Sequence, residues 1–324
     1  MMAHRVLVTG ALGCLGSWVV ATLVKQGVPV IAYDLADDPH RMRLILTSDE
    51  LDTVAFAQGD ITDGERLTAL VQDQGVTDII HLAALQVPAC KANPALGARV
   101  NVVGTVNVFE AARAAGLGRV VYASSVATYG AREDYDHPLI LPGDPLAPRT
   151  LYGAYKQANE ATARILWWDS GVSSIGLRPY VIYGPGRDQG MTSTPTKAML
   201  AAAAGLPYHI TYGGRCGLQY TADVAKLFVQ AIDVPFEGAG VYNIRGSVVD
   251  MREVVQAIEA AVPAMRGKIT HEIAPLPFPD GQDDSRLQAL LGPFAYTRLQ
   301  AGVAATIETF RAALADGRLS PETL

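Results

Sequence analysis

Short apolar runs alternate with helical patterns through the first half of the chain. The runs have the length of β-strands and cover residues 5–9, 28–33, 54–56, 78–82, 119–123 and 172–177. Apolar side chains recur at helical spacing in residues 18–25, 94–115 and 152–170. Strands that alternate with helices predict an α/β fold with a doubly wound parallel sheet, which binds ligands where its strands end.

The pattern becomes less regular after Arg178. Loops at 184–195 and 275–284 separate helical patterns at 196–204, 220–232, 250–261 and 296–313 and a strand at 240–244. We therefore expect a Rossmann-like dinucleotide-binding domain in residues 1–178, rejoined by about residues 217–244. Residues 179–324 are expected to form mainly a smaller C-terminal lobe that covers the substrate.

A glycine-rich turn lies between the first strand and the first helix. Glycines permit a tight turn and a close approach of pyrophosphate to the backbone, and the helix N-terminus supplies amides and a positive dipole. The glycine spacing of three and three differs from the two-then-three of the general fingerprint. A tight turn without a ligand is the alternative. The residues assigned to phosphate binding here are Gly10, Leu12, Gly13, Cys14, Leu15 and Gly16.

Acidic and small residues follow the other strands. Asp34 ends the second strand about 20 residues after the glycines, where a carboxylate accepts hydrogen bonds from the adenine ribose. A carboxylate there repels a 2′-phosphate, so Asp34 favours NAD over NADP, although Arg41 and Arg43 are close in sequence. Further residues expected at strand ends beside the cofactor are Asp60, Ile61, Leu82, Ala83, Ala84 and Ser125.

Tyr152 and Lys156 stand four residues apart at the start of a predicted helix. Residues at this spacing share a helical face, whereas the adjacent Tyr155 faces elsewhere. A nearby ammonium favours the ionised form of a phenol, so the pattern predicts a lowered pKa for Tyr152. A solvated pair on a surface helix is the alternative for an isolated Tyr-x-x-x-Lys pattern.

Composition narrows the class of protein. The 324 residues are 49% hydrophobic and 18% charged, with a net charge of −6 and no basic block, so we expect no nucleic-acid or membrane partner. Cys14, Cys90 and Cys216 are scattered, which predicts no disulfide framework and no metal site and fits the cytoplasm. Residues 5–9 read as a strand and not as a signal peptide, and the apolar runs are too short to span a bilayer.

A series of short motifs runs through nearly the whole chain. They are Thr9-Gly10-x-x-Gly13-x-x-Gly16, Asp34, Asp60-Ile61, His81-Leu82-Ala83-Ala84, Asn101, Tyr122-Ala123-Ser124-Ser125, Tyr129-Gly130, Tyr152-x-x-x-Lys156, Arg178-Pro179, Tyr183-Gly184-Pro185, Tyr220-x-x-Asp223-Val224-Ala225 and Leu290-Leu291-Gly292. In this order they resemble an extended short-chain dehydrogenase/reductase of the NAD-dependent epimerase/dehydratase family. The ordered set is far more specific than any one motif.

The resemblance implies roles for named residues and NAD as the cofactor. Tyr152 would be the general base, Lys156 would hold the nicotinamide ribose and depress the tyrosine pKa, and Ser125 would donate a hydrogen bond to the substrate oxygen. Asn101, Pro179 and Val181 join the cofactor-binding residues. The implied substrate-binding residues are Gln86, Ser125, Tyr152, Tyr180, Arg187 and Arg215. In the family, the helices corresponding to 94–115 and 152–170 pair between subunits, which implies a homodimer.

Three departures from the family pattern bear on the substrate. Val126 and Ala127 replace the Asp-Glu pair that family dehydratases carry after the catalytic residue, which argues against a dehydratase. Val181 stands where nucleotide-sugar enzymes usually have asparagine. Arg215 lies one residue outside the usual register of a diphosphate clamp, and residues 277–281 supply no second arginine. Diphosphate charges without partners bind poorly in a partly dry cleft, which weakens the nucleotide-sugar interpretation.

We therefore expect an NAD-dependent oxidoreductase that oxidises a secondary hydroxyl of a sugar, sugar acid or similar polyol. The sequence leaves open whether it releases a ketone, as a dehydrogenase, or returns the hydride, as an epimerase. One alternative is a nucleotide-sugar epimerase with a variant diphosphate clamp. An alternative from another class is a redox-silent NAD-binding regulator, although such proteins usually lose the tyrosine or the lysine.

Overall fold

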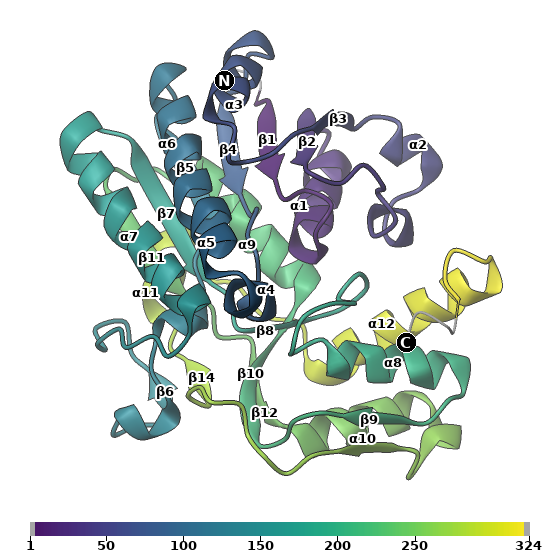
Figure 1. Ribbon diagram of the computed structural model, residues 1–324. Coiled ribbons are helices and arrows are strands. Elements are labelled where there is room, and N and C mark those ends of the chain that lie inside the picture. Colours follow the sequence, from purple (N-terminus) through teal and green to yellow (C-terminus); the bar gives the residue numbers. More distant parts are fainter. Residues whose placement is uncertain (1–3, 321–324) are drawn as a thin grey trace.

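A seven-stranded parallel sheet forms the centre of the larger lobe in the computed structural model, which describes residues 4–320 (Figure 1). The strand order is β11-β7-β5-β4-β1-β2-β3, and every neighbouring pair is parallel. The strands are β1 (Val6–Thr9), β2 (Val30–Asp34), β3 (Ala55–Gln58), β4 (Asp78–His81), β5 (Arg119–Ala123), β7 (Ser173–Arg178) and β11 (Ala239–Asn243). This arrangement confirms the predicted doubly wound α/β fold.

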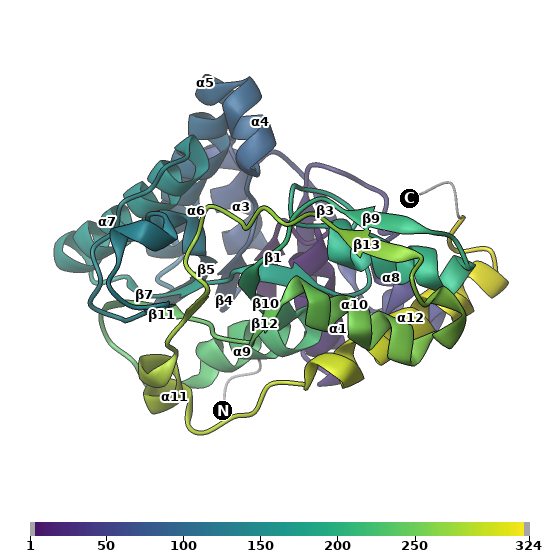
Figure 2. The same ribbon diagram turned by 90° about the horizontal axis from the view of Figure 1, so that it is seen from below.

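Helices cover both faces of this sheet, as Figures 1 and 2 show. The helices of the larger lobe are α1 (Cys14–Lys25), α2 (Ser48–Leu51), α3 (Gly64–Asp73), α4 (Val87–Ala92), α5 (Pro94–Ala98), α6 (Gly104–Ala114), α7 (Leu151–Ser170), α9 (Thr221–Asp233) and α11 (Ser285–Leu291). Along β1, Val6 and Val8 enter the core with α1 and α9, whereas Leu7 enters the core with α3 and α6. Burial on both faces explains why the strands read as continuous apolar runs.

Helix α7 begins and ends at residues that cap it. The Thr150 hydroxyl accepts a hydrogen bond from the Gly153 amide (3.0 Å), and Gly171 follows the helix in the left-handed conformation with φ of 70°. Both are local signals that fix a helix boundary. They place Tyr152 in the first turn of α7, at the edge of the sheet where the strands end.

The helical segment predicted at residues 94–115 contains a π-helical turn, Arg99–Val103, between α5 and α6. Asn101 lies in this turn with its side chain fully buried. Its Oδ1 accepts from the Leu85 amide (2.7 Å) and its Nδ2 donates to the Leu85 carbonyl (2.9 Å). The π turn thus holds the segment after β4, which apolar periodicity alone does not predict.

A smaller lobe follows β7 and has its own hydrophobic core. A three-stranded mixed sheet contains β8 (Val181–Tyr183), β10 (Arg215–Tyr220) and β12 (Ser247–Asp250), and β9 (Tyr208–Ile210) pairs with β13 (Ile269–His271). The helices of this lobe are α8 (Thr194–Ala204), α10 (Met251–Ala261) and α12 (Leu299–Ala315). No helix within residues 4–320 is long and apolar enough to cross a membrane.

Two short strands outside the larger sheet pair with each other. β6 (Leu139–Ile140) lies within residues 128–150, and β14 (Gly281–Gln282) lies in the loop at 275–284. The two strands pair in parallel, with Leu139 opposite Gly281. This pairing fixes the second loop next to the larger lobe.

Candidate active site

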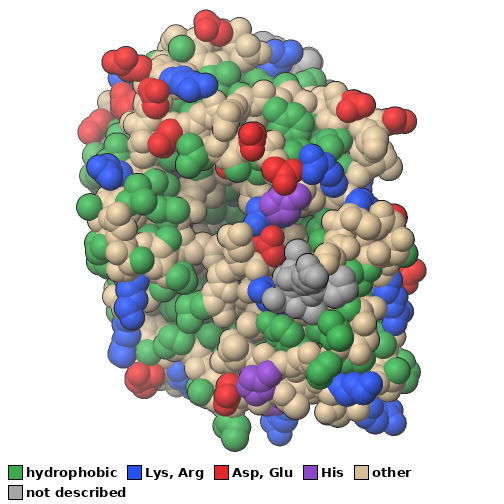
Figure 3. Space-filling model, turned by 45° about the vertical axis from the view of Figure 1, so that its right-hand side comes forward, with side chains coloured by type: hydrophobic (Ala, Val, Ile, Leu, Met, Phe, Trp, Pro, Cys, Tyr) green, Lys and Arg blue, Asp and Glu red, His purple; other side chains and the backbone are tan. Residues whose placement is uncertain are grey.

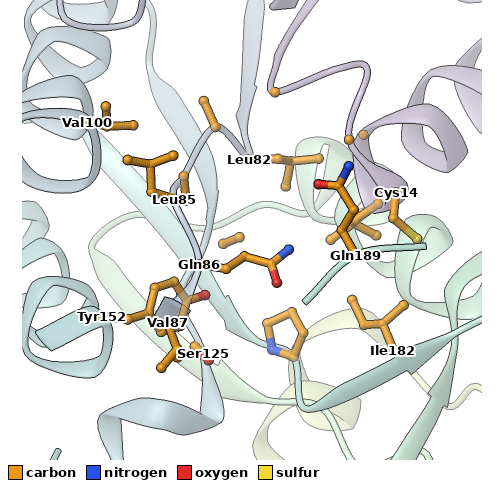
Figure 4. A pocket seen from close by; sticks show the side chains of 18 of the residues that line it. Cys14, Leu82, Leu85, Gln86, Val87, Val100, Ser125, Tyr152, Ile182 and Gln189 are labelled. Carbon is orange, nitrogen blue, oxygen red and sulfur yellow. The ribbon is translucent and has the colours of Figure 1, made fainter. Parts of the chain in front are cut away.

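A cleft with a volume of ≈ 780 Å³ opens where the strands of the larger sheet end. Figure 3 shows a hollow near the centre of one face. In Figure 4 the side chains of Tyr152 and Ser125 lie across the cavity from Cys14 and Ile182, and the Gln86 side chain extends between them. The predicted residues that line the cleft are Gly10, Leu12, Gly13, Cys14, Leu15, Gly16, Asp34, Asp60, Ile61, Leu82, Ala83, Ala84, Gln86, Ser125, Tyr152, Lys156, Pro179, Tyr180, Val181 and Arg187. The structure therefore brings most of the predicted site into one cavity.

The glycine turn has the geometry of a phosphate cradle. Gly10 has φ of 68°, and a Cβ on Gly16 would overlap the Gly10 carbonyl oxygen, so both positions require glycine. Helix α1 starts at Cys14, and its N-cap, Gly13, has no side chain to accept hydrogen bonds from the first turn. Amides at a helix N-terminus and the helix dipole favour an anion at this point.

Asp34 is held beside this turn by two backbone amides. The Leu12 amide donates to Asp34 Oδ2 (2.9 Å), and the Ala36 amide donates to Oδ1 (3.1 Å). Arg41 is already engaged: its Nη1 donates to the Leu12 carbonyl (2.9 Å) and its Nη2 pairs with Asp188 Oδ1 (2.9 Å). The acidic side chain therefore borders the groove at the position predicted for the ribose.

Tyr152 lies next to Ser125 in the cleft (Figure 4). Burial raises the pKa of Tyr152 above its ordinary value, and the hydrogen bond with Ser125 and the charge of Arg187 offset this only in part. The lowered pKa predicted from the sequence is therefore wrong for the polypeptide itself. The physical reason is that desolvation of the phenolate outweighs the neighbouring charges.

Lys156 is buried behind Tyr152. Its Nζ lies 5.8 Å from the centroid of the Tyr152 ring and donates a hydrogen bond to the Ala123 carbonyl at the end of β5 (2.6 Å). Burial lowers the pKa of Lys156 to about 8. The ammonium group is thus fixed at the strand end, with donor capacity left for the cleft.

A buried ion pair anchors the helix that carries Tyr152 and Lys156. Glu160, one turn after Lys156, accepts two hydrogen bonds from Arg178 at the end of β7, with Nε–Oε1 at 2.8 Å and Nη2–Oε2 at 2.6 Å. The Ser124 hydroxyl also donates to Glu160 Oε1. Fork-shaped pairing of this kind fixes orientation as well as distance, so α7 has a defined position against β5 and β7.

Two predicted residues do not reach the cleft. The Asn101 side chain is directed to Leu85, so it supports a cleft-lining segment and does not line the cavity itself. Arg215 is exposed at the start of β10, where its Nη2 donates to the Val248 carbonyl (3.2 Å). The expectation that these two side chains contact cofactor and substrate has no support in this geometry.

The sequence interpretation missed several residues of the cavity. Asp188, Met191 and Thr192 come from the loop after β8, and Phe278 comes from the loop before β14. Phe278 stacks edge-on against Tyr180, with ring centroids 6.0 Å apart. Glycine and proline in both loops indicated irregular structure, but no local pattern indicates which side chains of a loop face a cavity.

The cleft fits NAD on its own features. The glycine turn offers free helix amides for a pyrophosphate, Asp34 offers a carboxylate for ribose hydroxyls, and Lys156 offers an ammonium at the other end. Small residues after β4, Ala83 and Ala84, leave space for a ligand against the backbone. Charge and shape therefore match a dinucleotide with a free 2′-hydroxyl.

Comparisons with known proteins agree with this geometry. Residues 6–244 match the model of the NAD dependent epimerase/dehydratase family. The chain is 33% identical to a UDP-glucose 4-epimerase of Mycolicibacterium smegmatis over 320 residues, which cover 95% of this chain and 98% of the relative. The solved structure of a Thermus thermophilus UDP-glucose 4-epimerase in complex with NAD superimposes with a TM-score of 0.81 at 26% identity, covering 95% of this chain and 99% of that one.

A second kind of relative shares the fold. A GalE-like L-threonine dehydrogenase from Cupriavidus necator, in its holo form, superimposes with a TM-score of 0.80 at 25% identity and covers 94% of this chain and 99% of that chain. The similar proteins thus include both epimerases and a dehydrogenase. By its sequence and its fold, the chain is an NAD-dependent enzyme that belongs to the NAD-dependent epimerase/dehydratase family.

Proposed function

We propose that the protein oxidises a secondary hydroxyl of a sugar, sugar acid or similar polyol with NAD. The observation that carries the proposal is the convergence of Ser125, Tyr152 and Lys156 in one cleft with the cofactor-binding residues. Bound NAD supplies the hydride acceptor. All other steps are assigned to side chains of the chain itself.

Each of the three residues has one main task. Tyr152 accepts the proton of the substrate hydroxyl as general base. Ser125 donates a hydrogen bond to the same substrate oxygen, and its own orientation is set by the Ala127 amide, which donates to its Oγ (3.1 Å). Lys156, with a pKa of about 8, is mainly protonated at neutral pH, and its charge favours the phenolate in a buried site.

The alternative is a nucleotide-sugar epimerase with a variant diphosphate clamp. The similarity to UDP-glucose 4-epimerases over almost the whole chain favours it. The position of Arg215 outside the cleft and the apolar Val181 inside it speak against a clamp of the usual kind. We therefore rank a free, sugar-like substrate first. A redox-silent regulator ranks last, because tyrosine and lysine are both present in the cavity.

An activity screen tests the proposal. The purified protein with NAD is assayed against free sugars, aldonates, uronates, polyols and UDP-sugars, with NADH absorbance and product analysis for 4-epimers as the two readouts. NADH formation with a free sugar-like substrate supports the proposal. Turnover of UDP-sugars alone, or strong competitive inhibition by UDP, GDP or dTDP, would replace it with the epimerase alternative.

In this proposal the two lobes divide the work. Residues 1–178, rejoined by about residues 217–244, hold the cofactor, and residues 179–324 mainly cover the substrate. A cytoplasmic location is part of the proposal, because Cys14, Cys90 and Cys216 are all free thiols.

We also propose a two-fold homodimer built on α6 and α7. Val103, before α6, and Ile165 and Trp168 of α7 are apolar side chains with exposed fractions of 46%, 45% and 67%. Leu166 and Trp167 of the same helix are half-buried within the protomer. Exposed apolar side chains on neighbouring helices are suited to a partner surface.

A further inference from the structure

One arginine in the cleft has no acidic partner. The cationic side chains that line the cavity, within the described residues, are Arg41, Lys156 and Arg187. Arg41 is neutralised by Asp188, and Lys156 stands behind the catalytic tyrosine. Arg187 forms no ion pair anywhere in residues 4–320. Its Nη2 donates to the Thr192 hydroxyl (3.0 Å), whereas its Nε is buried and has no hydrogen-bond partner.

The loop after β8 gives Arg187 and Asp188 opposite surroundings. Asp188 meets Arg41 across the cleft, with Arg41 Nε at 3.1 Å from both carboxylate oxygens. The adjacent Arg187 does not share this carboxylate. Its guanidinium lies next to Gly190: a Cβ added to this glycine would be 3.2 Å from Arg187 Nη2. A buried guanidinium nitrogen without an acceptor is costly, so the loop leaves Arg187 with charge and donor capacity that a bound anion can use.

Arg187 is close to the reacting end of the cleft. It lines the same cavity as Tyr152 and Gln86, and its charge acts on the Tyr152 phenol. The Gln86 side chain lies beside Arg187, because a Cβ added to Gly190 would meet both Gln86 Oε1 and Arg187 Nη2. Its charge also acts on the Cys14 thiol at the start of α1. Arg187 thus lies between the phosphate turn and the tyrosine, so an anion bound to it comes either from the cofactor or from the molecule whose hydroxyl meets Tyr152.

We propose that Arg187 binds a carboxylate of the substrate, so that the enzyme acts on a hydroxy acid such as a sugar acid and not on a neutral sugar. The proposal rests on the proposed function and narrows its substrate class. A guanidinium pairs with a carboxylate through parallel hydrogen bonds, and one arginine is sufficient for this group. A nucleoside diphosphate carries more charge than one arginine neutralises.

The acidic residues of the cleft distinguish a hydroxy acid from an amino acid. Asp34 ends β2 and Asp60 follows β3, at the end assigned to the adenine ribose, and Asp188 is paired with Arg41. An ammonium group next to the substrate carboxylate would thus find no unpaired carboxylate among the described lining residues near Tyr152. A substrate with a carboxylate and hydroxyls alone satisfies the site.

Matched acid and neutral probes test this assignment. Binding of D-galacturonate and D-galactose, D-glucuronate and D-glucose, and D-erythronate and erythritol to the NADH-loaded protein is measured by calorimetry, with L-threonine as the amino-acid probe. KM and kcat are measured with NAD for each probe that is oxidised. We expect at least one acid to bind about 10–100-fold more tightly than its neutral partner, the range for a hydrogen-bonded charged group.

The variants are Arg187→Gln, Arg187→Lys and the control Arg266→Gln, which removes an exposed arginine outside the cleft. Arg187→Gln should raise the Kd and KM for the acid by about 10–100-fold and leave the weak binding of the neutral partner within about threefold. Arg187→Lys should restore part of the loss, because it keeps a charge without the fork. The control should match the wild-type protein.

Several outcomes would overturn the assignment. It fails if no acid binds better than its neutral partner, if L-threonine binds best, or if Arg187→Gln changes acid and neutral probes equally. It also fails if that variant loses affinity for NADH or UDP-galactose by the factor expected for the acid, since Arg187 would then serve a phosphate. Oxidation of a neutral sugar with no effect of Arg187→Gln would remove this inference and leave the proposed function standing. Absence of oxidation of any sugar-like probe, with acid binding intact, would remove the proposed function alone.

Discussion

Arg41 and Asp188 form a salt bridge that joins two segments 147 residues apart on the lining of the cofactor cleft. Arg41 Nη1 also donates to the carbonyl of Leu12 in the glycine turn (2.9 Å). This engagement matters for cofactor choice, because Arg41 is the basic side chain close to Asp34 that a 2′-phosphate would need. With Arg41 neutralised, a 2′-phosphate meets the Asp34 carboxylate without compensation.

The first prediction is that NAD binds more tightly than NADP. Asp34→Ala should narrow the gap, since it removes the repulsion of the 2′-phosphate together with the acceptor for the ribose hydroxyls. Asp188→Asn should narrow it in a second way, by releasing Arg41 from its partner while keeping the shape of the side chain. Calorimetric titration with each cofactor checks both variants. Equal affinities of the wild-type protein for NAD and NADP would refute the assignment of Asp34.

The second prediction identifies the base. Tyr152→Phe removes only the phenol hydroxyl and should lower turnover by about 10²–10⁴-fold, while NAD affinity changes little. Tyr155→Phe is the matched control, because the Tyr155 hydroxyl donates to the Pro94 carbonyl (2.9 Å) outside the cleft. Steady-state kinetics and NAD titration of both variants give the answer. Near-normal turnover in Tyr152→Phe with loss of turnover in Tyr155→Phe would show that the wrong tyrosine was chosen.

A structural feature can be predicted from the sequence when the residues that cause it are close together in the chain. Strand runs and the glycine turn are local features, and each predicted an element that the structure contains. Thr150 and Gly171 are local signals of the same kind at the two ends of α7. Chain order then placed Asp34 and Ser125 at strand ends, because parallel strands end at the same edge of a sheet. Most of the cleft follows from these two facts.

The features that escaped prediction are contacts between distant segments. The pairing of β6 with β14 and the salt bridge between Arg41 and Asp188 join residues more than a hundred positions apart, and no periodicity records them. The π turn at Asn101 is a local irregularity of the helix, and the Asn101 side chain forms hydrogen bonds with Leu85, 16 residues earlier in the chain. The raised pKa of Tyr152 depends on how deeply the finished fold buries the phenol, which a four-residue spacing does not report.

The third prediction concerns pH. Turnover should rise with pH through the pKa of Tyr152 in the working complex, because the base must lose its proton. Burial raises the pKa of Tyr152 and the hydrogen bond with Ser125 lowers it, so Ser125→Ala should shift the rising limb of the profile to higher pH. Ser124→Ala is the control, since the Ser124 hydroxyl bonds to Glu160 and not to the phenol. An unshifted limb in Ser125→Ala would contradict the assigned hydrogen bond.

The fourth prediction is a dimer in solution. Light scattering at micromolar concentration should give twice the mass of the chain, and Ile165→Glu should give a monomer, because it places a charge in the proposed apolar interface. Arg164→Glu is a neighbouring control on the same helix that changes charge; the Arg164 guanidinium lies 5.7 Å from the Trp168 ring, so a smaller effect is expected. A monomeric wild-type protein would exclude this interface.

The last prediction separates the chemical role of Lys156 from its effect on stability. The pKa of Lys156 is lowered from 10.5 to about 8 by burial, so the unfolded chain binds more protons than the folded chain between these values. The free energy of unfolding should therefore rise as the pH rises from about 8 to 10.5, and the cost of the buried charge is fully present below pH 8.

Lys156→Met should abolish most of the turnover and weaken NAD binding, yet stabilise the cofactor-free protein at pH 7. The expected gain is about 2 kcal/mol, because the lowered pKa of Lys156 corresponds to a cost of about 3 kcal/mol at pH 7, and the lost hydrogen bond to the Ala123 carbonyl contributes about 1 kcal/mol. Urea unfolding of both proteins at pH 7 and pH 10 measures this, and the difference between them should shrink at pH 10. A variant that is less stable than the wild type at pH 7 would mean that Lys156 supports the fold itself, and that its burial is not a cost retained for catalysis.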